Sequence, residues 1–306
     1  MCALEVEGNL RTGLSYDSDL RCRYLYDIVM TGVDGPQKSI VLPSDGLITL
    51  RFGEENSFAA RVGYDLAAVF AHPACSRIAF SGGIGWERTV RKDLLLALHG
   101  DFAYGAGNFS AWENRHVSGT IDGYIEWAAG EQVSLYGTVS AAYWKGLLAD
   151  KLDYLDGPVI GGEGGIIWYP EGDAAHLKIG AGGAVTLFRD EVFMTDLPFA
   201  ISGRYGEFLL TAETAYRYKK FTVQGEVRYR YLQWFNKDNL ESGPKRRTDH
   251  ILTTVPELRF DLTGYLGLSL SYALTAAFSN IGADAGDYTD YTYLRHVGTL
   301  SVYGWF

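Results

Sequence analysis

The sequence predicts a transmembrane antiparallel up-and-down β-barrel of about fourteen strands, and three observations carry that prediction. Apolar and polar residues alternate with a period of two from end to end, as in strands with two different faces. The mean hydropathy is only -0.05, and no apolar run approaches the roughly 18 to 20 residues that a membrane helix needs. The connections between the expected strands alternate between short and long. Only every second residue of a barrel strand faces lipid, so a barrel keeps its average hydropathy near zero.

The alternation is clearest in six segments: 3–16, 58–71, 92–106, 206–218, 220–235 and 266–279. In 220–235, one face carries Phe221, Val223, Val227, Tyr229 and Tyr231, and the other carries Gln224, Glu226, Arg228 and Arg230. Further strands are expected near 46–55, 75–89, 112–128, 131–145, 157–169, 174–189, 249–263 and 291–306. The segment 157–169 fits least well because it is rich in glycine.

The connections sort into two kinds. Short ones fall near 54–57, 89–93, 128–131, 170–174, 219–220 and 263–266. They alternate with connections near 17–45, 71–75, 106–111, 146–156, 190–205, 236–248 and 280–290, most of which are longer. Transmembrane barrels have short turns at one end and longer loops at the other, whereas a soluble sandwich has no reason to sort its connections. We therefore expect residues 1–306 to form a single barrel domain with both termini at the short-turn end.

Composition and motifs exclude several other classes. The net charge of -10, without a Lys/Arg stripe, argues against nucleic acid as a partner. The three cysteines have no metal-ligand spacing, and no Lys-Ser/Thr follows the run Gly161–Gly165, so no metal, cofactor or phosphate loop is expected. No signal peptide follows Met1. Because an exported barrel needs one, we expect the chain to be the mature form or nearly so.

The chain ends in the strand-like run LSVYGWF (300–306), with alternating apolar positions and a terminal Phe306. This run resembles the closing strand of Gram-negative outer-membrane proteins, although Gly304 stands where that pattern usually has a larger apolar residue. In size and strand count the chain is similar to the monomeric fourteen-stranded porins. The resemblance implies a location in the bacterial cell outer membrane, assembly by the barrel assembly machinery through the strand ending at Phe306, and passive diffusion of small polar or charged solutes rather than catalysis.

A barrel of about fourteen strands is wide enough for a pore unless a loop or a network of side chains closes it. The residues expected to line the pore are Arg51, Arg61, Arg77, Asp101, His116, Asp122, Glu126, Glu213, Arg217, Glu226, Arg228, Arg230 and Arg259. A two-residue turn at Lys219-Lys220 would set Glu213 directly opposite Glu226, where Arg228 on the diagonal could bridge them. These charges form either a neutralised network or a substrate site.

The order of the inward charges along the chain suggests a field across the lumen. Bases concentrate on 46–89 and 206–263, whereas acids lie between these segments and beside the closure; the acids are Asp101, Asp122, Glu126, Glu163, Glu5, Glu7, Glu257 and Asp261. We therefore expect walls of opposite sign and, because acids are in excess, a mild preference for cations. Aromatic residues near strand ends are expected to form girdles at the two membrane interfaces; they are Tyr143, Trp144, Trp168, Tyr169, Trp234, Phe235 and Trp305.

Two other functions stay open, and the first is an outer-membrane barrel enzyme of the lipase, deacylase or protease type. His116 and Ser118 share a strand face with Glu126, which resembles the His-x-Ser arrangement of lipid A deacylases. Those enzymes are much smaller barrels with a lipid-facing site, whereas this pair is expected to point inward. His99 and Asp101 also share a face and could pair. The third class is a closed barrel that serves adhesion or surface display through the loop at 17–45.

Two of the three cysteines are expected at the end of the barrel that carries the long loops. Cys22 lies in the first long connection and Cys75 in the next connection on the same side, in an oxidising compartment. A disulfide between them would tie the first long loop down, provided that their Cα atoms lie within about 7 Å. Free thiols, or pairing of either cysteine with another partner, remain the alternatives.

Overall fold

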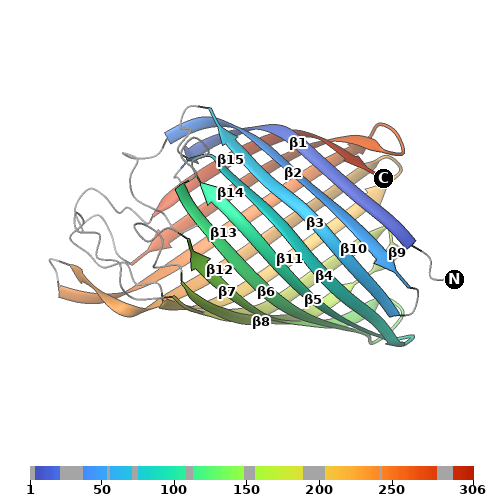
Figure 1. Ribbon diagram of the computed structural model, residues 1–306, viewed down its shortest axis with the longest axis horizontal. Coiled ribbons are helices and arrows are strands. Elements are labelled where there is room, and N and C mark those ends of the chain that lie inside the picture. The colour runs from blue at the N-terminus through green and yellow to red at the C-terminus, as the bar shows by residue number, and fades with distance from the viewer. Residues whose placement is uncertain are drawn as a thin grey trace.

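In the computed structural model, the described residues are 4–20, 37–53, 56–70, 75–107, 113–147, 156–188, 204–240, 243–280 and 292–306. They form a closed antiparallel barrel of fourteen strands (Figure 1). The ring consists of β1 (Leu4–Leu20), β2 (Gln37–Phe52), β3 (Asn56–Val69), β4 (Arg77–Arg91), β5 (Leu94–Gly107), β6 (Glu113–Ala128), β7 (Val133–Gly146), β8 (Gly157–Trp168), β10 (Ala175–Leu187), β11 (Arg204–Tyr218), β12 (Phe221–Leu240), β13 (Gly243–Asp261), β14 (Leu266–Ser279) and β15 (Tyr293–Trp305). The described residues include no helix long and apolar enough to cross a membrane.

Each strand pairs with its neighbours along the chain, and β1 pairs with β15 to close the ring. The closing ladder runs from Asn9 opposite Trp305 to Asp17 opposite Val297. The four-residue β9 (Pro170–Asp173) lies outside the ring, in the connection between β8 and β10. We call the rim that carries the short connections the turn side and the opposite rim the loop side.

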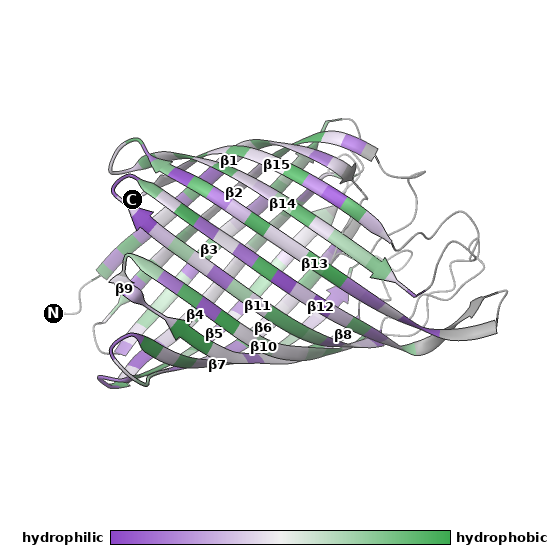
Figure 2. Cartoon of the chain, turned by 180° about the vertical axis from the view of Figure 1, so that it is seen from behind, coloured by the Kyte–Doolittle hydropathy of each residue, from purple (hydrophilic) through white to green (hydrophobic). Residues whose placement is uncertain are grey.

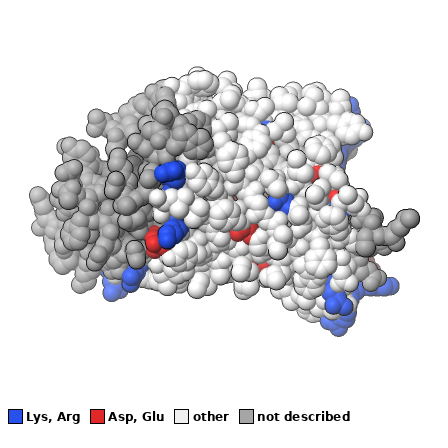
Figure 3. All heavy atoms as spheres, in the orientation of Figure 1, with Lys and Arg blue, Asp and Glu red and all other residues white. Residues whose placement is uncertain are grey.

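The period of two in the sequence places apolar side chains on the outside. Val62, Ile84 and Val139 are 68%, 71% and 67% exposed, which is unusual for aliphatic residues in a folded protein. Figure 2 shows hydrophobic and hydrophilic positions alternating along the strands. Acidic and basic side chains are few on the face seen in Figure 3. An apolar outer wall on a closed barrel is the arrangement that a bilayer requires, because no backbone edge is left unpaired in lipid.

The fourteen expected strands are all confirmed, and most boundaries shift by only a few residues. The largest shift concerns β2, which begins at Gln37 and not near 46, so the connection expected at 17–45 is shorter. Because of Pro43, this part of the strand was not predicted from the sequence. It pairs with Ala67 of β3, but the ladder to β1 skips from Thr12–Ser44 to Ser15–Val41, since proline has no N–H to donate.

The loop expected at 236–248 is wrong. β12 and β13 continue as a hairpin that pairs Lys237 with Arg246 and Leu240 with Gly243, beyond an irregularity in register after Gln233. In Figure 1 this orange hairpin extends past the loop-side ends of its neighbours. The sequence there is polar at nearly every position, so no apolar alternation marked it as strand.

Candidate functional site in the lumen

The inward face of the barrel changes from exposed to buried between its two ends. Along β1, the side chains of Glu7 and Arg11 are 51% and 30% exposed, whereas Ser15 is 6% and Asp17 is 1% exposed. The strand β11 shows the same trend, from Arg217 near the turn side, at 66%, to Tyr205 near the loop side, at 3%. On these two strands, the inward face is therefore open near the turn side and packed near the loop side, whereas Arg77 and Asp65, near the loop side of β3 and β4, stay 53% exposed.

The open half contains a cavity of about 550 Å³, which we call the turn-side chamber. Its polar lining comes from Glu7, Asn9, Thr49, Arg51, Arg61, Glu87 and His99, and Trp305 and Phe306 add an aromatic edge. Arg51 lies 2.9 Å from Glu87 and 3.7 Å from Glu7. His99 Nε2 lies 3.5 Å from Glu87. The chamber is thus lined by charges that are partnered yet still partly hydrated.

The next two pairs along this wall are also local. Arg61 donates from Nε to Asp101 at 2.7 Å and makes a second hydrogen bond from its Nη2. Arg77 lies 3.4 Å from Asp65 of the neighbouring strand. Asp122 lies beside these pairs, opposite His99 in the ladder between β5 and β6. His99 does not pair with Asp101, which it could have done by sharing a face: Arg61 contacts Asp101, and His99 lies 3.5 Å from Glu87 instead.

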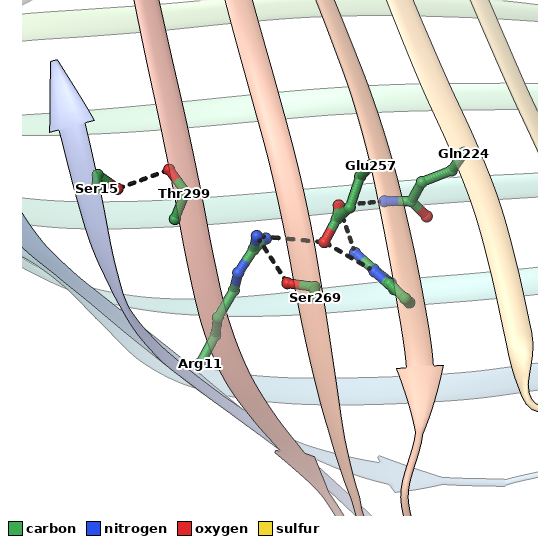
Figure 4. A network of polar contacts seen from close by, with 7 residues as sticks. Arg11, Ser15, Gln224, Glu257, Ser269 and Thr299 are labelled. Atoms are coloured by element: carbon green, nitrogen blue, oxygen red, sulfur yellow. Dashed lines mark hydrogen bonds and ion pairs between the residues drawn. The ribbon is translucent and has the colours of Figure 1, made fainter.

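The seam between the first and last strands is bridged from inside by a network of polar contacts (Figure 4). Arg11 of β1 reaches across β15 to Ser269 of β14, at 3.2 Å, and to Glu257 of β13, at 3.2 Å. Glu257 is 7% exposed and also accepts from Gln224 at 2.6 Å and from Arg259 at 3.1 Å. Ser15 and Thr299 share a hydrogen bond of 2.6 Å across the seam.

A second seam contact lies nearer the loop side. Arg295 of β15 donates to Asp17 of β1 from Nε at 2.9 Å and again from Nη2. Asp17 is almost completely buried, so this is a desolvated pair. The chain ends are thereby joined by ionic contacts as well as by the backbone ladder.

The two-residue turn at Lys219-Lys220 is confirmed, and Glu213 does lie opposite Glu226. Arg228 does not bridge both carboxylates: it lies 2.6 Å from Glu226, and Lys178 lies 3.6 Å from Glu213. Each glutamate has its own cation, which removes the repulsion between them.

The remaining predicted bases of this region are ion-paired as well. Arg230 contacts Glu207 through two hydrogen bonds of 2.8 and 2.9 Å. Arg217 lies 3.2 Å from Asp261. With Arg51, Arg61, Arg77, Arg228 and Arg259, every arginine that the sequence assigned to two basic walls has a carboxylate partner, and in every case but Arg61, whose partner Asp101 lies on β5, that partner is in the same wall. The structure therefore does not separate the charges into opposing walls.

Two inward carboxylates are held by hydroxyls. Glu163 of β8 accepts hydrogen bonds from Tyr136 and, at 2.8 Å, from Thr211. These three side chains lie across Gly180 of β10, where any Cβ would collide with them. Glu126 accepts from Tyr124 at 2.6 Å and from Tyr169 at 3.5 Å. Within the described part of the chain, no lysine or arginine forms an ion pair with either carboxylate.

The packed half of the lumen is formed by an aromatic and aliphatic group that we call the loop-side cluster: Tyr205, Leu232, Trp234, Ile251 and Ala277. Trp234 is 4% exposed, donates from Nε1 to Asp249 at 3.0 Å and lies under the guanidinium of Arg247 at 4.7 Å. Arg247 in turn lies 2.7 Å from Asp249. The cluster thus combines apolar packing with a buried ion pair.

Trp234 is one of several residues that were expected in the aromatic girdles but face the lumen instead. Tyr143, Trp168 and Phe235 are 52%, 45% and 41% exposed on the outer wall, as a girdle requires. In contrast, Trp144 stacks on the inward His116 and Trp305 lines the turn-side chamber. Tyr169 contacts the inward Glu126. Position at a strand end did not predict which face these residues occupy, because one residue of register reverses the face.

The residues considered for catalysis do not assemble. The His116 ring stacks on Trp144 at 5.6 Å, and Ser118 is buried at 6% exposure. Glu126 is ten residues further along β6, near the opposite end of the strand, where it contacts tyrosines. A base that distant does not orient the imidazole of a nucleophilic site. In the part of the chain described, no group of three or more His, Cys, Asp or Glu side chains is placed to hold a metal ion.

Cys75, which precedes β4 at the loop side, is disulfide-bonded. Cys22 lies outside the described residues, so its assignment as the partner stays a prediction. Leu4, two residues after Cys2, begins β1 at the turn side, whereas Leu20 ends it at the loop side. The topology therefore favours Cys22 over Cys2.

Several inward residues with central contacts were not among those expected to line the pore, namely Arg11, Asp17, Arg247, Asp249 and Arg295. Arg11 continues the row of Glu5 and Glu7, so strict alternation along β1 would have found it. Arg247 lay in the expected loop at 236–248 and Arg295 near the start of the last strand, where the inward row was not extended.

No protein-family model matches the sequence, and a comparison with curated proteins finds no match. Among solved structures, the chain is similar to the TodX monoaromatic hydrocarbon channel, with a TM-score of 0.54, 9% identity and coverage of 99% of this chain and 89% of that one. The outer membrane channel DcaP of Acinetobacter baumannii gives a TM-score of 0.51 at 9% identity, covering 99% and 97%. OmpT with a deletion of loop L8, an outer membrane protein of Vibrio cholerae, gives 0.50 at 8% identity, covering 100% and 99%. This chain therefore has the fold of these outer-membrane barrels, and its apolar outer wall is the surface that a transmembrane barrel presents to lipid.

Proposed function

We propose that this protein is an outer-membrane channel through which small polar or charged solutes diffuse passively. The observation that carries the proposal is the turn-side chamber, where partly exposed and partnered charges keep a hydrated cavity inside the barrel. Charges of both signs on an inward face need water or partners, and a barrel that served only as an anchor would be filled more stably by apolar side chains. Two proteins of similar fold, TodX and DcaP, are described as channels, which agrees with this role.

We also propose which part of the lumen limits the rate of solute diffusion. Solutes entering from the turn side would meet the loop-side cluster and the flanking pairs Arg230–Glu207 and Arg295–Asp17. We place the narrowest part of the channel there, since Tyr205, Trp234 and Asp17 are at most 4% exposed. Arg51, Arg61, Arg77, Asp101, His116, Asp122, Glu126, Glu213, Arg217, Glu226, Arg228, Arg230 and Arg259 then line the path, as proposed from the sequence.

We also propose that the channel has a mild preference for cations. The seven arginines of the two expected basic walls are neutralised by partners, whereas Asp122, Glu126 and Glu163 have no ion pair with a lysine or arginine of the described chain. The uncompensated charge of the lumen is therefore negative, which attracts cations from solution.

The closing strand supports the expected route of assembly. Phe306 is 67% exposed, and its backbone exchanges two hydrogen bonds with Gly8, of 3.0 and 3.1 Å. Its ring occupies the space above Gly8 where a Cβ would be. We propose that this outward terminal aromatic is read by the barrel assembly machinery. Deletion of Phe306 should then lower the amount of assembled barrel in cells, whereas Phe306→Tyr should not.

The channel is tested by reconstituting the purified, folded protein in a planar bilayer. We expect discrete conductance steps in KCl for protein whose gel mobility changes on boiling, which reports the folded barrel. The absence of steps from such protein would contradict the proposal and favour the closed barrel for surface display.

A further inference from the structure

The lipid-facing wall over β4 to β8 contains a groove of about 770 Å³. Its floor is formed where three outward positions are glycines, Gly82, Gly100 and Gly119. A Cβ placed on any of them would find nothing nearer than a backbone oxygen at 3.8 to 4.0 Å, so the space above each is open. The walls are Ile84, Phe102, Ile121, Tyr143, Pro158 and Ile160.

The groove follows from the strand register. Gly82 lies opposite Phe102, and Gly100 lies between Ile84 and Ile121. A large side chain on one strand therefore lies opposite a glycine on the next strand. The large ones stand outward, with Ile84 at 71% and Ile121 at 62% exposure. The result is an apolar depression about one side chain deep on a surface that faces the membrane interior.

Two basic residues lie at the loop-side end of this groove. Lys145 is exposed on β7, two residues beyond Tyr143 on the same face, and it pairs with Val117 as Tyr143 pairs with Gly119. Arg115 lies two residues beyond Val117 on β6, and its carbonyl accepts from the Leu147 amide at 2.8 Å. Figure 3 shows Lys and Arg atoms on this outer surface next to the region that is not described.

The described residues around this basic pair leave part of its hydrogen-bonding capacity unused. The Nε of Arg115 is buried and has no hydrogen-bond partner among the described residues, which is a costly state for a charged group. The carboxylate nearest to the pair in sequence position, Asp156, accepts a hydrogen bond from Tyr143 at 2.5 Å. Among the described side chains, neither Arg115 nor Lys145 forms an ion pair with a carboxylate.

We propose that this surface binds a phosphorylated glycolipid of the lipid A class, with one acyl chain in the glycine-floored groove and a phosphate on Arg115 and Lys145. The two halves of the surface match the two halves of such a lipid, because methylene groups gain from apolar burial and phosphate from paired guanidinium and ammonium donors. The basic pair lies at the loop side, and long loops of outer-membrane barrels face outward, so the adjoining leaflet is the outer one. Lipid A is the lipid of that leaflet. The site is on the outer wall and does not depend on whether the lumen conducts.

Native mass spectrometry of the folded barrel in detergent, titrated with purified lipid A, tests the proposal. We expect one tightly bound lipid A per chain. Lys145→Gln should weaken this binding about fivefold, from the loss of one interfacial charge. Gly119→Leu should weaken it about tenfold by filling the groove, since the new side chain displaces several methylene contacts without meeting any neighbour.

Matched controls separate binding from folding. Lys92→Gln removes an exposed charge from a turn-side connection, and Gly298→Leu adds a side chain at an outward glycine of β15 that also has no atom within 4 Å. Both should leave lipid A binding unchanged, and all variants should keep the boiling-dependent gel shift. Equal losses in the groove variant and the Gly298 control, or no loss in Lys145→Gln, would overturn the site. Equally tight binding of phosphatidylglycerol would overturn the assignment to lipid A.

Discussion

The two halves of the lumen are built from the same residue types but in different surroundings. At the turn side, Arg51 and Glu87 are 33% and 31% exposed and line the turn-side chamber, so each keeps part of its hydration. At the loop side, Arg295 and Asp17 are 24% and 2% exposed, and the cluster around Trp234 fills the adjacent space. An ion pair at the turn side therefore shapes the field in a hydrated chamber, whereas one at the loop side is part of the packing. The inward charge pattern in the sequence does not distinguish these two roles.

The largest difference between the halves should appear in stability. Asp17→Ala leaves the Arg295 guanidinium without its principal carboxylate in a buried place, and we expect it to lower the free energy of unfolding by about 3 kcal/mol. Glu87→Ala removes the partly exposed carboxylate beside Arg51 at the turn side and should cost less than about 1 kcal/mol. Urea unfolding of the barrel in lipid vesicles, followed by tryptophan fluorescence, measures both. Equal losses would show that the two halves do not differ in the way described.

The second contrast concerns conductance. Trp234→Ala removes the largest side chain of the loop-side cluster, so we expect a larger single-channel conductance together with a loss of stability of about 3 kcal/mol. Trp305→Ala, at the edge of the turn-side chamber, removes a side chain of the same size from the open half and should change conductance little. A conductance that rises only in the Trp305 variant would place the narrowest part at the other end.

The third expectation concerns the disulfide at Cys75. We expect unreduced peptides to show a Cys22–Cys75 bridge, because Leu20 and Cys75 lie at the same rim and Leu4 lies at the other. Reduction should leave the barrel folded and lower its resistance to urea by about 2 to 4 kcal/mol, the usual range for a bridge that closes a long loop. Mass spectrometry of alkylated protein decides the pairing, and labelling of Cys22 and Cys75 without reductant would contradict it.

The smallest effect should come from neutralising one charge in the turn-side chamber. Glu87→Gln leaves Arg51 with only the more distant Glu7, so the mild cation preference should shift toward anions. The shift should fade as KCl rises from 0.1 M to 1 M, where the screening length falls from about 10 Å to about 3 Å. Reversal potentials under a KCl gradient measure it. A shift that is independent of salt would indicate a change of pore shape instead.

The strand pattern was predictable because its cause is local: a residue faces lipid or lumen according to its parity, and each face has its own composition. The facing pair Glu213 and Glu226 was predictable for the same reason, since a two-residue turn fixes the register on both of its strands. The lipid-facing groove also rests on register, which relates glycines on β4, β5 and β6 that lie far apart in the sequence.

What the sequence did not predict depends on contacts that cross several strands or on where the wall leaves the bilayer. Arg11 reaches Glu257 over two intervening strands at the seam, which no neighbouring pair in the sequence reveals. The hairpin beyond Gln233 is polar at nearly every position of its sequence, so its strands lack the apolar row that marked the others. Trp144 and Trp234 were assigned by their place at strand ends, although parity, which places both inside, was the better guide.

We propose that the lumen is wide and hydrated at the turn-side chamber and narrowest at the loop-side cluster. Polymer exclusion tests it most directly: single-channel conductance is recorded while a polyethylene glycol of graded size is added to one compartment only. We predict a size range in which polymer lowers conductance from the turn side, where it enters the chamber, and has no effect from the loop side. Equal lowering from both sides at every size would contradict the account.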